Sequence, residues 1–218
     1  MPPSPSTPFP LSRAIPVPLP LAPIVRRFAL PPLFLALPAA LLSPPVGLAL
    51  VALGVAVALF FRDPSRTPEG PGVLSPADGR VSVIREEGVQ VRVGVFMSPL
   101  DVHVNRAPLG GEIAAAEHRP GAHRPAFSKD SERNERVDLA VDRHEVSLIA
   151  GWFARRIHPY VDAGDRVSRG DRIGVVAFGS RADVLLPPEY DRDDLLVEVG
   201  DRVRAGETVV ARRSESEF

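Results

Sequence analysis

The chain of 218 residues contains no cysteine. It therefore has no disulfide, no thiolate nucleophile and no cysteine ligand for zinc or an iron–sulfur cluster. Lysine is almost absent too, because 25 of the 26 basic residues are arginine and Lys129 is the one lysine. Pyridoxal enzymes hold their cofactor on a lysine, and Lys129 lies in a polar, loop-like run. If the chain uses a carbonyl group to react with an amine, a carbonyl made from its own residues is a simpler explanation than bound pyridoxal.

The net charge is also small. Its formal value is −1, so the chain as a whole has no electrostatic attraction to nucleic acid. Proline is abundant but uneven, since 14 of the 25 prolines fall within the first 45 residues. Residues 1–27 are Pro-rich, lack a helical period and are predicted to be disordered or extended.

Residues 28–61 contain no charged side chain, and Pro44 and Pro45 divide this segment. As a helix, residues 46–61 would be about 24 Å long, shorter than a bilayer core of about 30 Å. Two short apolar helices meeting at the prolines would form a hairpin, and arginines flank it on both sides, which suits two cytoplasmic ends. We predict a membrane anchor over residues 28–61. The alternative, a buried helical core, suits a shorter and less uniformly apolar run.

From residue 62 onward the pattern is typical of short strands. Residues 73–84 read as strand, turn and strand, residues 89–95 alternate with period two, and residues 137–149 read as two strands. Residues 161–170 are repeated at 197–206, each copy with a Gly-Asp turn before a valine. We predict a β-rich (α+β) domain over residues 62–218. It would have a barrel-sandwich-like core with duplicated hairpins, and the membrane hairpin would precede it.

A Gly-Ser pair, Gly179-Ser180, interrupts an otherwise apolar strand over residues 175–187. Alone, such a pair indicates a bulge. Here residues 178–184 (FGSRADV) resemble the self-processing site of phosphatidylserine decarboxylase proenzymes of the short, archaeal-type form. Further segments are similar to that family in the same order, so that the resemblance covers roughly residues 55–190: 61–66 (FRDPSR), 75–81 (SPADGRV), 96–108 (FMSPLDVHVNRAP), 134–136 (NER) and 154–157 (ARRI).

The resemblance implies that the bond between Gly179 and Ser180 breaks by self-cleavage and that Ser180 becomes a pyruvoyl group, which forms a Schiff base with the substrate. The products would be a large subunit, residues 1–179, and a small subunit, residues 180–218, joined as a heterodimer. The mature enzyme would convert phosphatidylserine to phosphatidylethanolamine and CO₂ at the cytoplasmic face of the cell membrane. Neither a metal nor a nucleic acid is implied. Relatives that act on modified headgroups remain an alternative.

Three residues are the candidate catalytic groups: Ser180, Asp78 in the SPADGRV segment, and His103. His103 is the candidate proton donor, because a histidine with an unperturbed pKa near 6.5 can give a proton back to carbon. The structural alternatives are a turn aspartate and a hydrogen-bonding histidine. Long-form relatives carry a second histidine where this chain has Arg106. The base that activates Ser180 is therefore left open, with Asp78 the better-supported partner.

Other classes share a β core of this kind. A lysostaphin-type zinc endopeptidase needs a His-x-His pair beyond the Gly-Asp turn, and no histidine follows His158. A biotin or lipoyl carrier needs a lysine at a hairpin tip, and the repeats contain none. A non-catalytic, membrane-anchored barrel-sandwich adaptor is the remaining alternative. Chain cleavage at Ser180 separates it from the enzyme.

Overall fold

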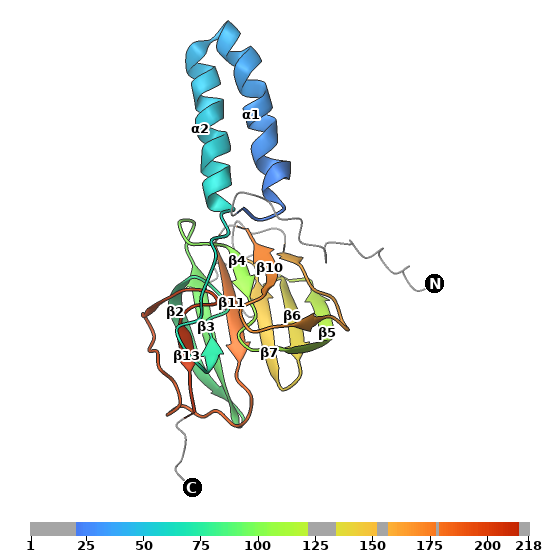
Figure 1. Ribbon diagram of the computed structural model, residues 1–218, viewed down its shortest axis with the longest axis vertical. Coiled ribbons are helices and arrows are strands. Elements are labelled where there is room, and N and C mark those ends of the chain that lie inside the picture. The colour runs from blue at the N-terminus through green and yellow to red at the C-terminus, as the bar shows by residue number, and fades with distance from the viewer. Residues whose placement is uncertain (1–20, 122–133, 152–156, 178, 214–218) are drawn as a thin grey trace, which may run out of the picture.

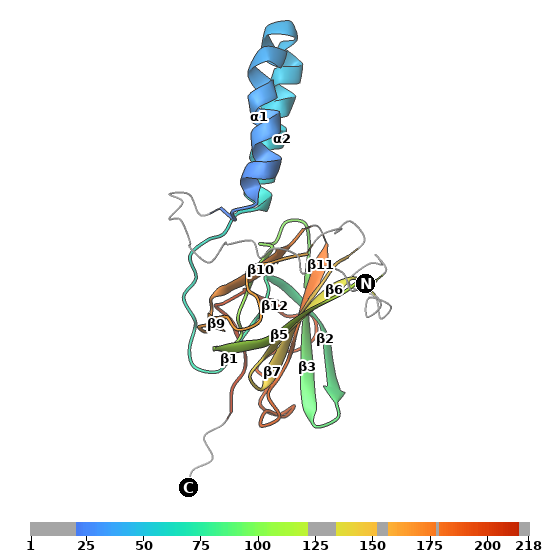
Figure 2. The same cartoon turned by 90° about the vertical axis from the view of Figure 1, so that its right-hand side faces the viewer.

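The computed structural model describes residues 21–121, 134–151, 157–177 and 179–213. It has two parts, an N-terminal pair of helices and a β domain (Figure 1). The helices project from one end of the β domain (Figures 1 and 2); they lie next to each other in Figure 1, and one lies in front of the other in Figure 2. The Pro-rich segment predicted to be disordered lies mostly outside the described residues.

The helical hairpin consists of α1 (Val25–Leu42) and α2 (Pro44–Phe60). The chain reverses at Ser43, whose backbone is extended, and Pro44 begins α2 at a position where its missing N–H is not needed. The two helices approach closely at glycines. A Cβ on Gly47 would lie 2.3 Å from Ala40 Cβ, and a Cβ on Gly54 would lie 2.5 Å from the Leu33 side chain. The hairpin confirms the predicted pair of apolar helices, although α1 begins three residues earlier than expected and continues through its own prolines.

Most large apolar side chains of the hairpin point away from the protein. Leu41 and Leu42 at its tip are 82% and 90% exposed, and Phe34 is 78% exposed. By length and composition α1 could cross a membrane, and α2 is a shorter apolar helix. This exposure is the opposite of what a buried helical core would show.

Both ends of the hairpin meet at the β domain. The Ala22 N–H donates to the Phe61 carbonyl at 2.8 Å, and the Phe28 and Phe61 rings stack with centroids 5.7 Å apart. Phe60 and Phe61 are buried in an apolar cluster that includes Val104 and Val175 of the β domain. The end of α2 is therefore packed onto the sheets rather than tethered by a loose linker.

Within the described residues, the β domain forms one eight-stranded sheet and two small sheets. The strand order is β12-β2-β3-β11-β7-β6-β5-β9 in the large sheet, β4-β10-β8 in the second and β1-β13 in the third. The strands are β1 (Val73–Leu74), β2 (Gly79–Glu87), β3 (Gln90–Met97), β4 (Val104–Arg106), β5 (Gly111–Arg119), β6 (Arg136–Val141), β7 (His144–Ile149), β8 (Ile157–Pro159), β9 (Arg166–Val167), β10 (Arg172–Val176), β11 (Ser180–Leu185), β12 (Arg202–Val203) and β13 (Val209–Ala211).

The predicted strands are confirmed. Residues 73–84 form β1, a turn and the start of β2, and residues 137–149 form the β6–β7 hairpin, whose turn residue Asp142 has a φ of 43°. The large sheet is strongly curled (Figure 2). Its inner face contributes to a core of mainly valine, leucine and isoleucine side chains, in which Leu139, Leu148 and Leu186 are fully buried.

The internal repeat places one short strand at each edge of the large sheet. β9 in the first copy pairs with β5, and β12 in the second copy pairs with β2. The turns are alike: Gly164 and Gly200 both have a positive φ, and Asp165 and Asp201 each accept a backbone N–H from three residues earlier at 2.8 Å. Each copy is a turn followed by an edge strand rather than a closed hairpin, because its strand pairs with a distant part of the chain.

Candidate active site

Ser180 stands where the chain leaves one sheet and enters another. β10 ends at Val176 in the three-stranded sheet, and β11 begins at Ser180 in the middle of the large sheet. The pair predicted to interrupt one strand therefore joins two strands in different sheets. Gly179 has a φ of +63°, which a side chain would strain.

The side chain of Ser180 points into the protein. Ser180 is fully buried, and Ala182 and Val184, on the same face of β11, belong to the core. Among the described residues its hydroxyl makes two weak contacts, at 3.4 Å from the Val176 carbonyl oxygen and 3.9 Å from Met97 Sδ. The hydroxyl is thus buried without a strong hydrogen bond that would fix it.

His103 is also fully buried, and its two ring nitrogens differ. Nδ1 lies 2.9 Å from the Asp101 carbonyl oxygen, so Nδ1 must carry the proton. Nε2 has no partner among the described residues. Burial lowers the pKa of His103 to about 4, although the Asp101 carbonyl opposes that shift. The imidazole is therefore neutral near pH 7, and Nε2 is a buried acceptor.

Val176 connects His103 to Ser180. Its N–H lies 3.4 Å from the His103 carbonyl oxygen, and its own carbonyl oxygen is the one nearest the Ser180 hydroxyl. One residue of β10 thus links the backbone of His103 to the Ser180 hydroxyl. His103 is oriented by the backbone of Asp101, while the Asp101 carboxylate binds the N–H and hydroxyl of Ser98.

Asp78 lies at the same end of the large sheet but is not bonded to Ser180 in the part of the chain that the structure describes. It immediately precedes β2, and β3 separates β2 from β11. Two strand spacings amount to about 10 Å. A Cβ on Gly79 would lie 2.0 Å from the Phe96 carbonyl oxygen, so this approach of β2 to β3 requires glycine.

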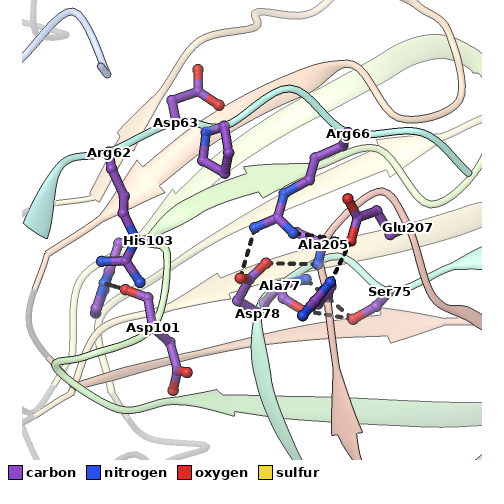
Figure 3. A network of polar contacts seen from close by, with 12 residues as sticks. Arg62, Asp63, Arg66, Ser75, Ala77, Asp78, Asp101, His103, Ala205 and Glu207 are labelled. Atoms are coloured by element: carbon purple, nitrogen blue, oxygen red, sulfur yellow. Dashed lines mark hydrogen bonds and ion pairs between the residues drawn. The ribbon is translucent and has the colours of Figure 1, made fainter. Parts of the chain in front are cut away.

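The Asp78 carboxylate is held by a network (Figure 3). Oδ2 lies 2.8 Å from Arg66 Nη2, and Oδ1 accepts the Ala205 N–H at 2.8 Å. Arg66 also contacts Glu207 at 3.1 Å. Desolvation raises the pKa of Asp78 above its usual value, against the lowering effect of the Ala205 N–H and Arg66. This network joins the FRDPSR and SPADGRV segments to residues 205–207 of the predicted small subunit.

Two buried residues of this region were not predicted from the sequence. The Asn105 amide Nδ2 lies 3.6 Å from Met97 Sδ, the sulfur that also faces the Ser180 hydroxyl, and 3.3 Å from the Pro76 carbonyl oxygen. The Phe60 ring packs on the His103 imidazole with centroids 4.2 Å apart. Asn105 lies in the segment that carries His103, so a polar residue two positions along a strand was the available signal. Nothing in the sequence pairs Phe60 with His103.

Arg106 stands where the sequence resemblance places a second histidine in long-form relatives. Its side chain makes contacts that support the fold. Its Nη2 donates to Asp63 Oδ1 at 2.9 Å and to the Pro64 carbonyl at 3.0 Å, and its Nη1 donates to the Gly170 carbonyl at 3.0 Å. Arg172 is a second partner of Asp63. Arg106 thus ties the segment after the hairpin to the β domain.

The residues that follow Ser180 are structural as well. Arg181 and Asp183 form a buried two-bond ion pair, at 2.7 and 2.9 Å, on the face of β11 opposite Ser180. Gly94 on the neighbouring strand is needed there, since a Cβ would lie 2.6 Å from Asp183 Oδ1. The arginine and aspartate of the FGSRADV run therefore hold β11 in place.

A cleft of about 660 Å³ opens beside the base of the hairpin. It is lined by Arg62, which follows α2 directly, and by Asp78, Asp101 and Arg202. Arg62 donates to the carbonyls of Leu59 in α2 and Leu100. Among the residues that the structure describes, no group of three His, Cys, Asp or Glu side chains is arranged to hold a metal ion.

Comparison with known proteins supports the family resemblance found in these segments. The profile of the phosphatidylserine decarboxylase family matches residues 53–211. The chain is 57% identical over 187 residues to a Halobacterium salinarum protein named as an archaetidylserine decarboxylase proenzyme, covering 85% of this chain and 95% of that one. It is 52% identical over 167 residues to the phosphatidylserine decarboxylase proenzyme of Thermobifida fusca, covering 74% and 76%.

A protein of Methanopyrus kandleri, also named as an archaetidylserine decarboxylase proenzyme, is 44% identical over 213 residues and spans 88% of this chain and 98% of its own length. The matching profile and the named relatives define a decarboxylase. The chain belongs to the phosphatidylserine decarboxylase family.

Proposed function

We propose that this chain is the precursor of a pyruvoyl-dependent phosphatidylserine decarboxylase, which cleaves itself between Gly179 and Ser180. One observation carries the proposal. Ser180 follows a left-handed glycine at a crossing between two sheets and is fully buried, and Val176 links it to the backbone of His103, a buried neutral histidine whose Nε2 has no partner among the described residues. A buried serine whose hydroxyl makes only weak contacts with the described residues is suited to act as a nucleophile once a base removes its proton.

The cleavage can be written with all atoms accounted for. Ser180 Oγ loses its proton and bonds to the Gly179 carbonyl carbon, the bond from that carbon to the Ser180 nitrogen breaks, and the nitrogen takes up a proton. The resulting ester then eliminates: the Ser180 Cα loses a proton and the Gly179 carboxylate leaves, so that residue 180 becomes dehydroalanine. Its imine form takes up water and releases ammonia, leaving a pyruvoyl group on chain 180–218.

His103 is the proposed base for these proton transfers. Its Nδ1–H is engaged by the Asp101 carbonyl, which directs the lone pair to Nε2. A pKa of about 4 keeps that lone pair free near pH 7. Once protonated, the same group is a stronger acid than an ordinary imidazolium, so it can also return a proton to carbon. The proton donor expected from the sequence is thus proposed to begin as an acceptor.

The surroundings of residue 180 suit a pyruvoyl group, because the residue is buried and its hydroxyl makes only weak contacts with the described residues, so that little hydrogen bonding to them is lost when the hydroxyl is converted. When present, such a group supplies the electrophile that captures a substrate amine and draws electrons as CO₂ leaves. Asp78 is proposed as the third residue of the site. It lines the cleft, and through Arg66 and Ala205 it joins the two segments that cleavage would separate.

A lipid substrate fits the position of the cleft, which opens where the apolar hairpin meets the β domain. We propose that the hairpin enters the cell membrane from the cytoplasmic side, with both ends held together at Ala22 and Phe61. The names of the relatives agree on a serine headgroup and differ in the lipid part, phosphatidyl or archaetidyl. Both lipids are therefore substrates to assay.

Intact masses under denaturing conditions test the cleavage. We expect a 1–179 fragment and a 180–218 fragment whose N-terminus is blocked as pyruvoyl. Ser180→Ala should remain at the full mass, while Ser147→Ala, which alters another buried serine of the large sheet, should still be cleaved. Asp78→Asn keeps an oxygen for the Ala205 N–H and should slow cleavage. A folded, uncleaved wild-type chain would favour the adaptor, and a cleaved chain that releases no CO₂ from either lipid would reject the proposed substrates.

A further inference from the structure

The buried Asn105 side chain has a hydrogen-bond acceptor that none of the described residues uses. Asn105 is fully buried, and its Oδ1 has no partner among the described residues. Buried polar atoms are nearly always hydrogen-bonded, so one that is not asks for a ligand or another explanation. His103 Nε2, two residues earlier in the chain, is a second buried acceptor without a partner in the described structure.

The residues that carry these acceptors are each linked to Ser180 through one neighbour. Met97 Sδ contacts Asn105 Nδ2 at 3.6 Å and the Ser180 hydroxyl at 3.9 Å, and Met97 is paired directly with Ser180 across β3 and β11. On the other side, Val176 joins Ser180 to the backbone of His103. The Asn105 side chain is therefore linked to residue 180 through one residue, Met97, and the backbone of His103 is linked to it through Val176.

Two buried acceptors require a ligand that donates. A carboxylate, a phosphate or a carbonyl has no N–H or O–H to offer them, whereas a primary amine in its ammonium form has three N–H groups. We propose that Asn105 forms a binding site for the primary amine of the substrate: Oδ1 accepts one amine N–H and so directs the nitrogen toward residue 180. This assignment rests on the proposed function and adds to it the residue that recognises the amine.

The alternative, a purely structural role for Asn105, predicts a different response to mutation. The one carbonyl that the Asn105 amide reaches, that of Pro76, also accepts the Arg106 N–H at 2.9 Å. Replacing Asn105 with leucine, which has nearly the same shape, therefore leaves no new unpaired group and removes one that is present. Such a replacement is neutral or stabilising when the lost polar group had no partner. A structural role would instead make the variant less stable.

The experiment uses the purified full-length protein. Phosphatidylethanolamine, which carries the same kind of amine, is supplied in mixed micelles with cyanoborohydride, which reduces the bond between a carbonyl and a captured amine. Capture is read as a mass increase on the 180–218 fragment, and melting temperature is measured beside it. The variants are Asn105→Leu, which removes the acceptor, and Asn105→Asp, which keeps one. Gln90→Leu is the control, since the Gln90 amide donates to the Leu186 carbonyl at the far end of β3.

We expect Asn105→Leu to be cleaved and to melt at or above the wild-type temperature. Its capture of amine should fall by about ten-fold or more, because one hydrogen bond to a charged group is lost. Asn105→Asp and Gln90→Leu should capture nearly as much as wild type. Equal capture by Asn105→Leu, a lower melting temperature, failure of its cleavage, or loss of capture in Asn105→Asp would each overturn the assignment. Absence of capture by the wild-type protein would instead reject the proposed pyruvoyl function.

Discussion

Phe60, the last residue of the helical hairpin, covers the imidazole of His103 with ring centroids 4.2 Å apart and an interplanar angle of 31°. The apolar hairpin is thus in direct contact with the histidine proposed as the base. Because burial is the main cause of the low pKa of His103, we expect the packing of Phe60 on the imidazole to contribute to that low pKa.

Phe60→Ala is therefore predicted to raise the pKa of His103 from about 4 toward its unperturbed value of about 6.5. Opening the space beside the ring lets water stabilise the charged imidazolium. The measurement is an NMR titration of the His103 ring protons in the Ser180→Ala precursor. Phe34→Ala is the matched control, because Phe34 is exposed on α1 and should leave the titration unchanged. An unchanged titration in Phe60→Ala would show that α2 does not control His103.

A second buried histidine makes the protein sensitive to acid. Burial lowers the pKa of His144 to about 4, and its Nε2 has no partner among the described residues. Since this value lies below the unfolded value of about 6.5, the stabilising contribution is complete above pH 6.5 and is lost as pH falls toward 4. The loss amounts to about 3 kcal/mol for one such group.

His144→Leu is predicted to flatten the fall of the unfolding free energy between pH 6.5 and pH 4, as measured by urea denaturation across that range. His118→Leu, at an exposed position, is the control for loss of a histidine. The prediction is wrong if both variants follow the wild-type curve.

Arg106 is predicted to stabilise the fold without taking part in the reaction. Arg106→Ala removes the buried contacts to Asp63, Pro64 and Gly170, and should lower the unfolding free energy by about 2–4 kcal/mol. Arg166→Ala removes an exposed ion pair with Glu112 and should cost at most about 1 kcal/mol.

At a temperature where Arg106→Ala is folded, its 180–218 fragment should form at the wild-type rate. A folded variant that fails to cleave would instead place Arg106 in the chemistry, where the long-form relatives carry histidine.

The tip of the hairpin is predicted to enter the bilayer. Leu41→Lys combined with Leu42→Lys puts two charges where the chain is 82% and 90% exposed, and each lysine deep in a bilayer costs about 2.5–3.5 kcal/mol. Liposome flotation should therefore drop sharply for this variant. Val89→Lys alters an equally exposed valine in the turn between β2 and β3, at 82%, and should float like wild type. Equal flotation of all three proteins would contradict membrane entry by the tip.

The sequence predicted those elements of the fold that depend on a pattern of residues close together in the chain. The uncharged run over residues 28–61, the period-two strands and the turns of the repeat each depend on neighbouring residues, and all of them appear in the structure. The full length of α1 was not predicted, because its prolines suggested a break. In the structure the helix continues through these prolines.

The sequence predicted which residues belong to the candidate site but not how they are arranged. Motif resemblance named Ser180, His103 and Asp78, but long-range pairing sets their roles. The strand order of the large sheet puts β3 between Asp78 and Ser180, and the Asp101 backbone rather than its carboxylate orients His103. Asn105 and Phe60 were missed, because their place beside the site depends on contacts with residues far away in the sequence.

The sequence by itself determined the family, the apolar hairpin and the strand-rich domain, because composition, periodicity and motif order are properties of short segments. Only the tertiary structure decided that Gly179 and Ser180 join two different sheets, that His103 is neutral with a buried Nε2, and that the buried Asn105 oxygen has no partner among the described residues. Burial and the pairing of distant strands produce these properties, and neither exists until the chain is folded.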